Sequence, residues 1–262
     1  MAETESVNND FYQNLGEKWL QGQDHPIALL RAEAGIKHAW VEQQLKDKQF
    51  YPIGFENSQI LDVGCGAGFL SIHLAEKGHS VTGLDLSEGV LKVANISRAS
   101  LNDQTQSRLK FTQGSGEILP FPTASFSVVC CMDVLEHVKD PAALVKECIR
   151  VLQPGGLFFF HTFNRTFLSK MLVIYGVNFF FKNVPKNLHL YDWFITPKEM
   201  QVYCQNEFAE ILKMTGLRPR IRLSQAWQIL RTGHVPMDFE FELCPSLMIG
   251  YMGVARKSQI DL

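Results

Sequence analysis

Residues 59–85 constrain the fold of this 262-residue chain more strongly than any other stretch. An apolar run at 60–63 precedes a glycine-rich turn, a helical pattern follows over 69–77, and a second apolar run ends in Asp85. Strand, glycine turn, helix, strand and acid in this order form a βαβ unit that binds nucleotides. With strands and helices continuing to alternate, the sequence predicts a doubly wound α/β sheet with helices on both faces.

The turn itself indicates which ligand binds. It reads Asp62-x-Gly64-x-Gly66-x-Gly68, so an acid precedes the glycines. A carboxylate there would repel the pyrophosphate of NAD, whereas it attracts a cationic amino-acid group. S-adenosylmethionine (SAM) carries an ammonium and a sulfonium and has no phosphate. We therefore expect SAM at these glycines, with the Asp85 carboxylate on its ribose hydroxyls.

This unit resembles the first motif of the class I SAM-dependent methyltransferases, which implies their Rossmann-like fold. In that superfamily the loop corresponding to residues 113–122 holds the adenine, although Ser115 stands where an aspartate is usual. The further cofactor-binding residues that we expect lie at or just after the ends of strands: Leu86, Gly116, Glu117 and Met132.

Composition excludes some partners and suggests a compartment. The chain has 25 basic and 27 acidic residues, so no overall field recruits nucleic acid. Its six cysteines lack the spacing of a zinc site and are typical of reduced core residues, and the acidic N-terminus is unlike a signal peptide. We expect a cytoplasmic protein.

Residues 1–50 precede the nucleotide unit, and we expect them to form a helical lid over the cofactor, with the methyltransferase domain spanning 51–262. Apolar residues recur at helical spacing in 25–44. Arg31 interrupts this apolar face. It either binds the carboxylate of SAM or is a surface arginine whose stem lies on apolar neighbours.

A group of potential metal ligands follows the strand predicted at 125–132. Asp133, Glu136 and His137 lie at i, i+3 and i+4, so on one helical turn they share a face and could hold Mg²⁺ or Zn²⁺. The alternative is a turn that flanks the cofactor without any metal.

Residues 163–197 form an insertion after the fifth strand. Its apolar run at 171–181 is too short to span a bilayer. Aromatic residues with the basic flanks Lys170, Lys182 and Lys186 suit a helix that lies on a membrane surface, so we expect residues 166–182 to dock on anionic lipids. The alternative is a buried substrate lid or a dimer contact.

Several segments together resemble the ubiquinone-biosynthesis O-methyltransferases. They are HPIALLR (25–31), LDVGCGAG (61–68), VTGLD (81–85), CMDVLEHVKDP (131–141), Asn164-Arg165 and PKNLHLYDWFITP (185–197). The resemblance implies methylation of a catechol hydroxyl on a polyprenylated quinone precursor. One departure is Asp133, where the family has glutamate, which weakens the expected metal site.

Such a reaction needs an aligned acceptor oxygen and the removal of one proton. We expect His189 as the base and His137 as a metal ligand or second catalytic residue, with His161 as a third candidate. Two alternatives remain: a methyltransferase for another lipophilic or small phenolic substrate, and an inert scaffold in a quinone-synthesis complex. Intact glycines and Asp85 argue against the scaffold. The oligomeric state stays open.

Overall fold

The computed structural model describes residues 7–13, 15–16, 18–23, 26–50, 58–181, 184–185 and 187–259. Within them, one eight-stranded sheet has the order β3-β2-β1-β4-β5-β8-β6-β7. The strands are β1 (Gln59–Val63), β2 (Ser80–Asp85), β3 (Leu109–Gln113), β4 (Phe126–Met132), β5 (Leu152–Phe163), β6 (Ala209–Arg220), β7 (Glu240–Cys244) and β8 (Gly250–Lys257). The pairs among β1 to β5 are parallel, and β8, β6 and β7 add antiparallel pairs.

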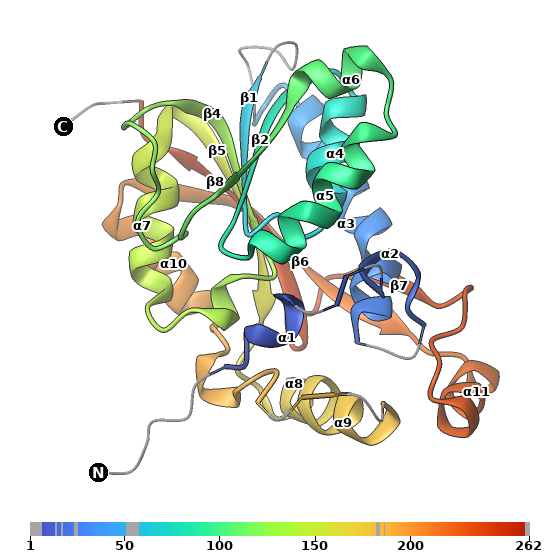
Figure 1. Cartoon of the computed structure of the whole chain (residues 1–262). Helices are drawn as coiled ribbons and strands as arrows, with labels where there is room; N and C mark the ends of the chain where they lie inside the picture. The colour runs from blue at the N-terminus through green and yellow to red at the C-terminus, as the bar shows by residue number, and fades with distance from the viewer. Residues whose placement is uncertain are drawn as a thin grey trace, which may run out of the picture.

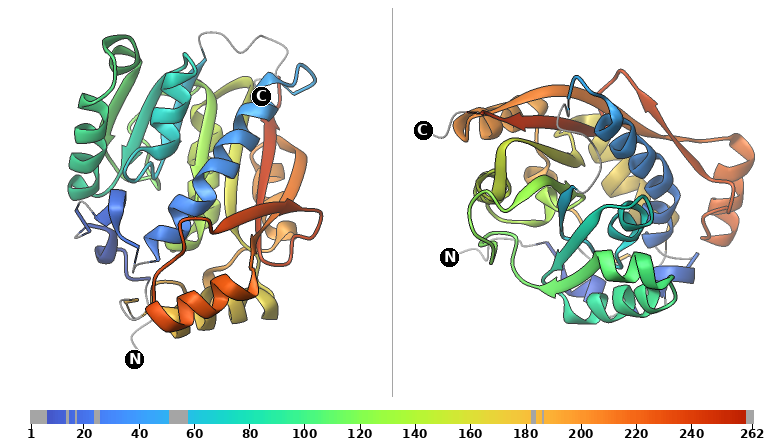
Figure 2. Two further views of the ribbon diagram at one scale, coloured as in Figure 1. Left: turned by 90° about the vertical axis from the view of Figure 1, so that its right-hand side faces the viewer. Right: turned by 90° about the horizontal axis from the view of Figure 1, so that it is seen from above.

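Helices cover both faces of this sheet (Figures 1 and 2). They are α1 (Asp10–Gln13), α2 (Lys18–Gln21), α3 (Ile27–Lys46), α4 (Phe69–Glu76), α5 (Glu88–Ala99), α6 (Asp103–Arg108), α7 (Pro141–Val151), α8 (Phe167–Ser169), α9 (Val177–Phe180), α10 (Pro197–Asn206) and α11 (Leu223–Thr232). Short 3₁₀ turns lie at Leu135–His137 and Tyr191–Trp193. The predicted doubly wound, Rossmann-like architecture is confirmed.

The central strands are apolar on both sides because both faces are covered. In β5, Phe158 and Phe160 belong to the core beneath α7 and α10, whereas Phe159 belongs to the core beneath α3 and α4. The ring of Phe159 meets Trp40 of α3 edge-on, with centroids 6.0 Å apart. Successive side chains of a strand point to opposite faces of the sheet, which explains this alternation. The same alternation determines the face to which each side chain near the carboxyl end of β5 points.

Two of the shorter helices have identifiable end signals. α6 begins after Asn102, whose side chain accepts a hydrogen bond from the Thr105 N–H (2.9 Å) and caps the helix. α11 lies between strands β6 and β7. That helix ends at Gly233, which has the left-handed φ of +71° common after a helix.

The N-terminal segment contributes both a cover and part of the core. Trp19 of α2 lies over the glycine turn: a Cβ on Gly66 would be 3.3 Å from its ring. The second half of α3 instead packs on the sheet through Trp40, Val41 and Leu45. The predicted domain boundary at 50/51 borders residues 51–57, which lie outside the described residues.

The insertion forms one helical segment over 167–180, in which α8, a π-helical stretch at Lys170–Gly176 and α9 follow one another. It lies beside α11 at one end of the molecule, where Phe181 and Ile229 pack in one apolar cluster (Figure 2). Lys182 and Lys186, two of the predicted basic flanks, lie outside the described residues. Within the described residues, no helix has the length and apolar character needed to cross a bilayer.

Candidate active site

A cavity of about 650 Å³ opens at the carboxyl ends of the parallel strands, where ligands bind in open α/β sheets. Eight of the predicted cofactor residues line it: Asp62, Gly64, Gly66, Asp85, Leu86, Gly116, Glu117 and Met132. The same cavity continues past the end of β4 to the insertion and α11. One continuous space therefore joins the glycine turn to an apolar chamber.

The glycines of the turn have backbone dihedral angles that other residues adopt only with strain. Gly64 has φ +68° and Gly66 has φ +54°. A Cβ on Gly64 would lie 2.3 Å from Cγ2 of Val134, so the turn packs directly against the residue that follows Asp133. Glycine is thus required at Gly64 by both conformation and space.

Two acids lie beside this turn. The Asp85 carboxylate accepts hydrogen bonds from the N–H groups of Gly66 and Ser87 (both 2.9 Å), which fixes its orientation. Asp62 is buried and accepts a hydrogen bond from Ser71 Oγ (2.6 Å). Burial raises the pKa of the Asp62 carboxyl to about 7, and the nearby Asp85 charge adds to this. A cationic group bound here would lower the pKa and hold Asp62 ionised.

Two predicted cofactor residues lie elsewhere. Gly68 caps α4 with φ +82°, and a Cβ there would be 2.6 Å from the Phe111 ring, so its glycine is needed for packing. The Arg31 guanidinium donates to the carbonyls of Lys18 (3.1 Å), Trp19 (2.9 Å) and Gly22. Arg31 therefore ties the end of α2 to α3, and its contact with a SAM carboxylate stays a prediction.

The predicted metal ligands do not share a face. Asp133 has φ +61° and lies outside the short 3₁₀ turn that holds Glu136 and His137. Both Asp133 oxygens accept hydrogen bonds from Nζ of Lys37 (2.7 and 2.6 Å). No group of three or more His, Cys, Asp or Glu side chains among the described residues is arranged to hold a metal ion. The residues therefore do not fit the predicted Mg²⁺ or Zn²⁺ site, because a lysine ammonium takes the place of the cation.

Lys37 is the centre of a buried ionic network. It is 4% exposed and pairs with Glu33 (2.9 Å), one turn earlier on α3, as well as with Asp133. Asp133 in turn contacts Nδ1 of His161 on β5. Burial alone would raise the pKa of the Asp133 carboxyl, but Lys37 and His161 outweigh it and hold the pKa well below its usual value. The Lys37–Asp133 pair is therefore charged.

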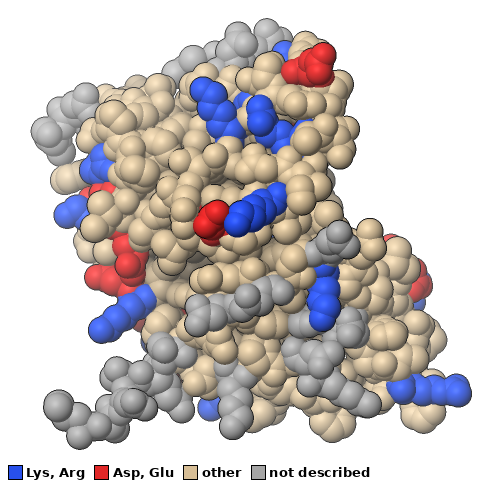
Figure 3. All heavy atoms as spheres, in the orientation of Figure 1, with Lys and Arg blue, Asp and Glu red and all other residues tan. Residues whose placement is uncertain are grey.

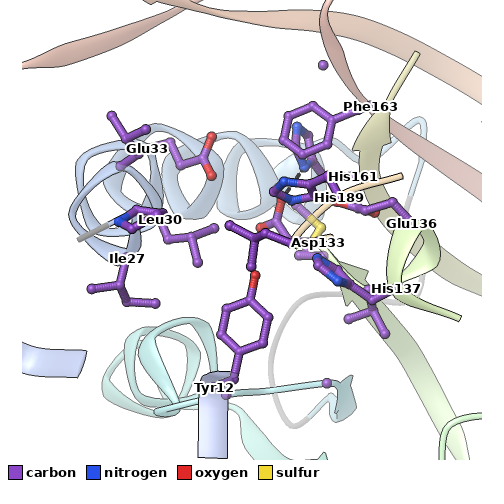
Figure 4. A pocket seen from close by; sticks show the side chains of 18 of the residues that line it. Tyr12, Ile27, Leu30, Glu33, Asp133, Glu136, His137, His161, Phe163 and His189 are labelled. Carbon is purple, nitrogen blue, oxygen red and sulfur yellow. Dashed lines mark hydrogen bonds and ion pairs between the residues drawn. The ribbon is translucent and has the colours of Figure 1, made fainter. Parts of the chain in front are cut away.

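The two histidines predicted as catalytic, His137 and His189, also line the cavity (Figure 4). The rings of His137 and His189 are 5.1 Å apart, and His189 also meets Phe163 edge-on at 5.4 Å. Burial lowers the pKa of His189 to about 3, and the neighbouring His137 adds to this. Burial likewise lowers the pKa of His137 to about 4. Both imidazoles are neutral at neutral pH, and the role of His189 as base stays a prediction.

Sequence reasoning missed Lys37, Glu33 and Tyr12, all of which line the cavity. A signal for the first two was present. Glu33, Lys37 and Val41 recur at i, i+4 and i+8 on α3, so an acid and a base lie on a helix face that is buried and largely apolar. A charged pair on a buried helix face needs partners from elsewhere in the chain.

Known proteins with similar sequences indicate the family of this chain. The methyltransferase domain family matches residues 61–160. The ubiquinone biosynthesis O-methyltransferase of Coxiella burnetii (strain RSA 493 / Nine Mile phase I) is 30% identical over 243 residues, which cover 92% of this chain and 91% of that one. The enzyme of the same name from Pasteurella multocida (strain Pm70) is 32% identical over 222 residues, 79% of this chain and 85% of that one.

Solved structures support the fold. Magnesium protoporphyrin IX methyltransferase from Synechocystis PCC 6803, with bound SAH, matches with a TM-score of 0.64 at 17% identity, covering 95% of this chain and 97% of that one. A SAM-dependent methyltransferase from Methanosarcina mazei matches with a TM-score of 0.55 at 24% identity, covering 78% and 94%. With the sequence relatives, these matches show that the chain is a SAM-dependent methyltransferase and belongs to the ubiquinone biosynthesis O-methyltransferase family.

Proposed function

We propose that this enzyme transfers a methyl group from SAM to a phenolic or catechol hydroxyl of a polyprenylated quinone precursor in ubiquinone biosynthesis. The observation that carries the proposal is the single cavity, which has a glycine turn at one end, histidines in the middle and an apolar chamber at the other. The names of the sequence relatives agree with it.

At the first end, the residues fit SAM. Its sulfonium, when bound, supplies an electrophilic methyl group. The positive φ angles of Gly64 and Gly66 shape the turn that lines this end, and Asp85 is oriented to accept hydrogen bonds from ribose hydroxyls. Asp62 would face the ammonium group, and Gly116 and Glu117 the adenine.

The far end suits an isoprenoid tail. Its walls are side chains of the insertion (Val173, Val177, Phe180), of α11 (Ala226, Ile229) and of the region around β7 (Phe239, Phe241). Burial of the tail against this wall contributes about 25 cal/mol to the binding free energy for each Å² of apolar surface removed from water. His137 and His189 lie between the two ends, where they would contact and orient the aromatic ring of the acceptor.

A series of catechol acceptors with zero, one, two and three isoprene units tests the substrate class. We expect kcat/KM to rise with tail length, because each added unit buries more apolar surface in the chamber. Highest kcat/KM for the tail-free catechol would favour the second candidate, a methyltransferase for a small phenol. Binding of SAM without transfer to any member of the series would refute the proposal.

The outer surface of the insertion supports docking of residues 166–182 on an anionic membrane, and with it a cytoplasmic, membrane-peripheral location. Phe167 and Phe179 are 74% and 75% exposed, while the adjoining α11 exposes Leu223 (92%) and Trp227 (69%). The end of the molecule that carries α8 and α9 shows few charged side chains in Figure 3. These apolar groups could enter the interface between lipid headgroups and acyl chains.

Liposome flotation tests this docking. We expect Phe179→Glu to reduce binding to anionic vesicles, and added salt to weaken the binding of the wild type. Phe208→Glu is the matched control. Phe208 is 61% exposed but lies beside Ser258, at the end of β8 far from the cavity. Equal loss of binding in both variants would contradict docking through the insertion.

A further inference from the structure

Two histidines that line the cavity have a ring nitrogen with no hydrogen-bond partner among the described residues, His137 (Nδ1) and His161 (Nε2). His161 is fully buried, and its Nδ1 contacts Asp133 while its Nε2 has no partner. Because the ionised carboxylate only accepts hydrogen bonds, Nδ1 carries the proton and Nε2 keeps its lone pair. Nε2 lies next to Gly250: a Cβ on that residue would be 2.9 Å away. Both residues line the cavity.

Asp133 is itself held on its other side. Nζ of Lys37 reaches both carboxylate oxygens, so the carboxylate has a fixed position between an ammonium and an imidazole. A carboxylate in this place fixes both the tautomer and the orientation of its histidine. Among the described contacts of the four histidines that line the cavity, only that of His161 is with a carboxylate.

His161 lies where the two halves of the cavity meet. Its partner Asp133 precedes Val134, which packs against Gly64 of the cofactor turn. On the other side, the His161 ring lies 5.6 Å from that of Phe163, which meets His189 in the acceptor half. Asp133, His161 and His189 all line this part of the cavity (Figure 4).

We propose that Nε2 of His161 accepts the proton of the substrate hydroxyl, with Asp133 and Lys37 as the positioning residues behind it. This inference rests on the proposed function. As the acceptor oxygen bonds to the methyl carbon, its O–H bond breaks and the proton passes to Nε2. The bond between methyl carbon and sulfur breaks with its electron pair remaining on sulfur. The imidazolium is stabilised by Asp133 and later loses its proton to water.

The groups around His161 suit this role. Burial and the Lys37 charge lower the pKa of its imidazole against the effect of Asp133, so the ring is neutral and ready to accept a proton. The other titratable groups that face the same part of the cavity are Tyr12 from α1, Glu33 from α3, Glu136 and His137 after β4, and His189 before the 3₁₀ turn at Tyr191–Trp193. The Lys37 ammonium supplies the positive charge that a metal ion would otherwise bring to Asp133.

Single-turnover kinetics with saturating SAM and the prenylated catechol, and steady-state kinetics with varied SAM, test the proposal on the full chain. We expect His161→Gly to lower kcat by about 10²- to 10⁴-fold, with the KM for SAM unchanged within about twofold. Added imidazole should restore activity at least about tenfold in His161→Gly and have no effect on His189→Ala. Chelation should leave the wild-type rate unchanged.

Nitrogen-15 NMR of the histidine-labelled enzyme gives a readout that needs no substrate. We expect His161 to carry its proton on Nδ1 at neutral pH, and Asp133→Asn to lose this preference. A His161→Gln enzyme that keeps its kcat within about threefold, a proton on Nε2 in the wild type, or a loss on chelation that Mg²⁺ restores would overturn the proposal. If the variants do not fold, the wild-type NMR measurement decides. No methyl transfer by the wild type would instead refute the proposed function.

Discussion

The two ends of the cavity are built from different parts of the chain. The cofactor end is made of backbone: two glycines with positive φ, and the ends of the adjacent parallel strands β1 and β2. The acceptor end is made of side chains that meet across long sequence separations. Lys37 lies 96 residues from Asp133, and Asp133 lies 28 residues from His161. The first end is determined locally, and the second only by the tertiary fold.

This difference predicts where substitutions affect folding and where they affect binding. A buried charge that loses its partner destabilises the folded state. Substitution of a carboxylate that lies at the cavity surface and binds a ligand chiefly lowers the affinity for that ligand. The acceptor end should therefore be sensitive in unfolding experiments, and the cofactor end in binding experiments.

The largest loss of stability from a single substitution is expected at Lys37. Lys37→Met removes the cation between a buried carboxyl, Glu33, and a half-buried one, Asp133, and we expect the free energy of unfolding to fall by about 3 kcal/mol, measured by urea denaturation. Adding Asp133→Asn should recover part of this loss. Lys92→Met is the matched control, because Lys92 pairs with Glu88 on an exposed surface and should change stability by less than about 0.5 kcal/mol. Equal effects for the two lysines would contradict the difference expected between the two ends of the cavity.

The same difference explains what the sequence could predict. The glycine turn, Asp62 and Asp85 are recognisable because strand, turn and acid are consecutive, and the backbone they specify is the binding surface. The contacts of Lys37 and His161 cannot be predicted in this way, since each depends on the partner that the tertiary fold brings to it. Asp133 is an example: the sequence shows its spacing to Glu136, which suggests a metal site, but not its ammonium partner on α3.

The second prediction concerns the cofactor end. Asp85→Ala should weaken SAM binding by about 1–3 kcal/mol through the loss of charge-assisted hydrogen bonds, as measured by calorimetry. Asp85→Asn keeps an oxygen for the Gly66 N–H and should lose less. Unchanged affinity in a folded Asp85→Ala variant would show that this acid does not contact the cofactor.

A third prediction uses pH to examine the acceptor end. Burial raises the pKa of the Glu136 carboxyl from 4.5 to about 8, and the Asp133 charge adds to this. The folded state then binds a proton that the unfolded state has lost, so this carboxyl lowers stability as pH rises from about 4.5 to 8, by at most about 1.4 kcal/mol per pH unit. Thermal denaturation of Glu136→Gln should show a flatter pH dependence than the wild type. An identical dependence would show that Glu136 is ionised in the folded enzyme.

Substitution of Arg31 is expected to give the smallest effect. It tests whether the cofactor end also contains a cation that binds SAM. In the structure its guanidinium holds three carbonyls at the end of α2, whose Trp19 lies over Gly66. If that is its task, Arg31→Met should lower the free energy of unfolding by about 1 kcal/mol, and SAM affinity by less, because only the cover over the turn is loosened. If Arg31 instead binds the carboxylate of SAM, the loss of a charged hydrogen-bond partner should weaken SAM binding by about 1.5–3 kcal/mol.

The comparison of SAM with adenosine separates the two cases. Adenosine lacks the carboxylate, so a loosened cover weakens the binding of both ligands alike, whereas a lost ion pair weakens that of SAM alone.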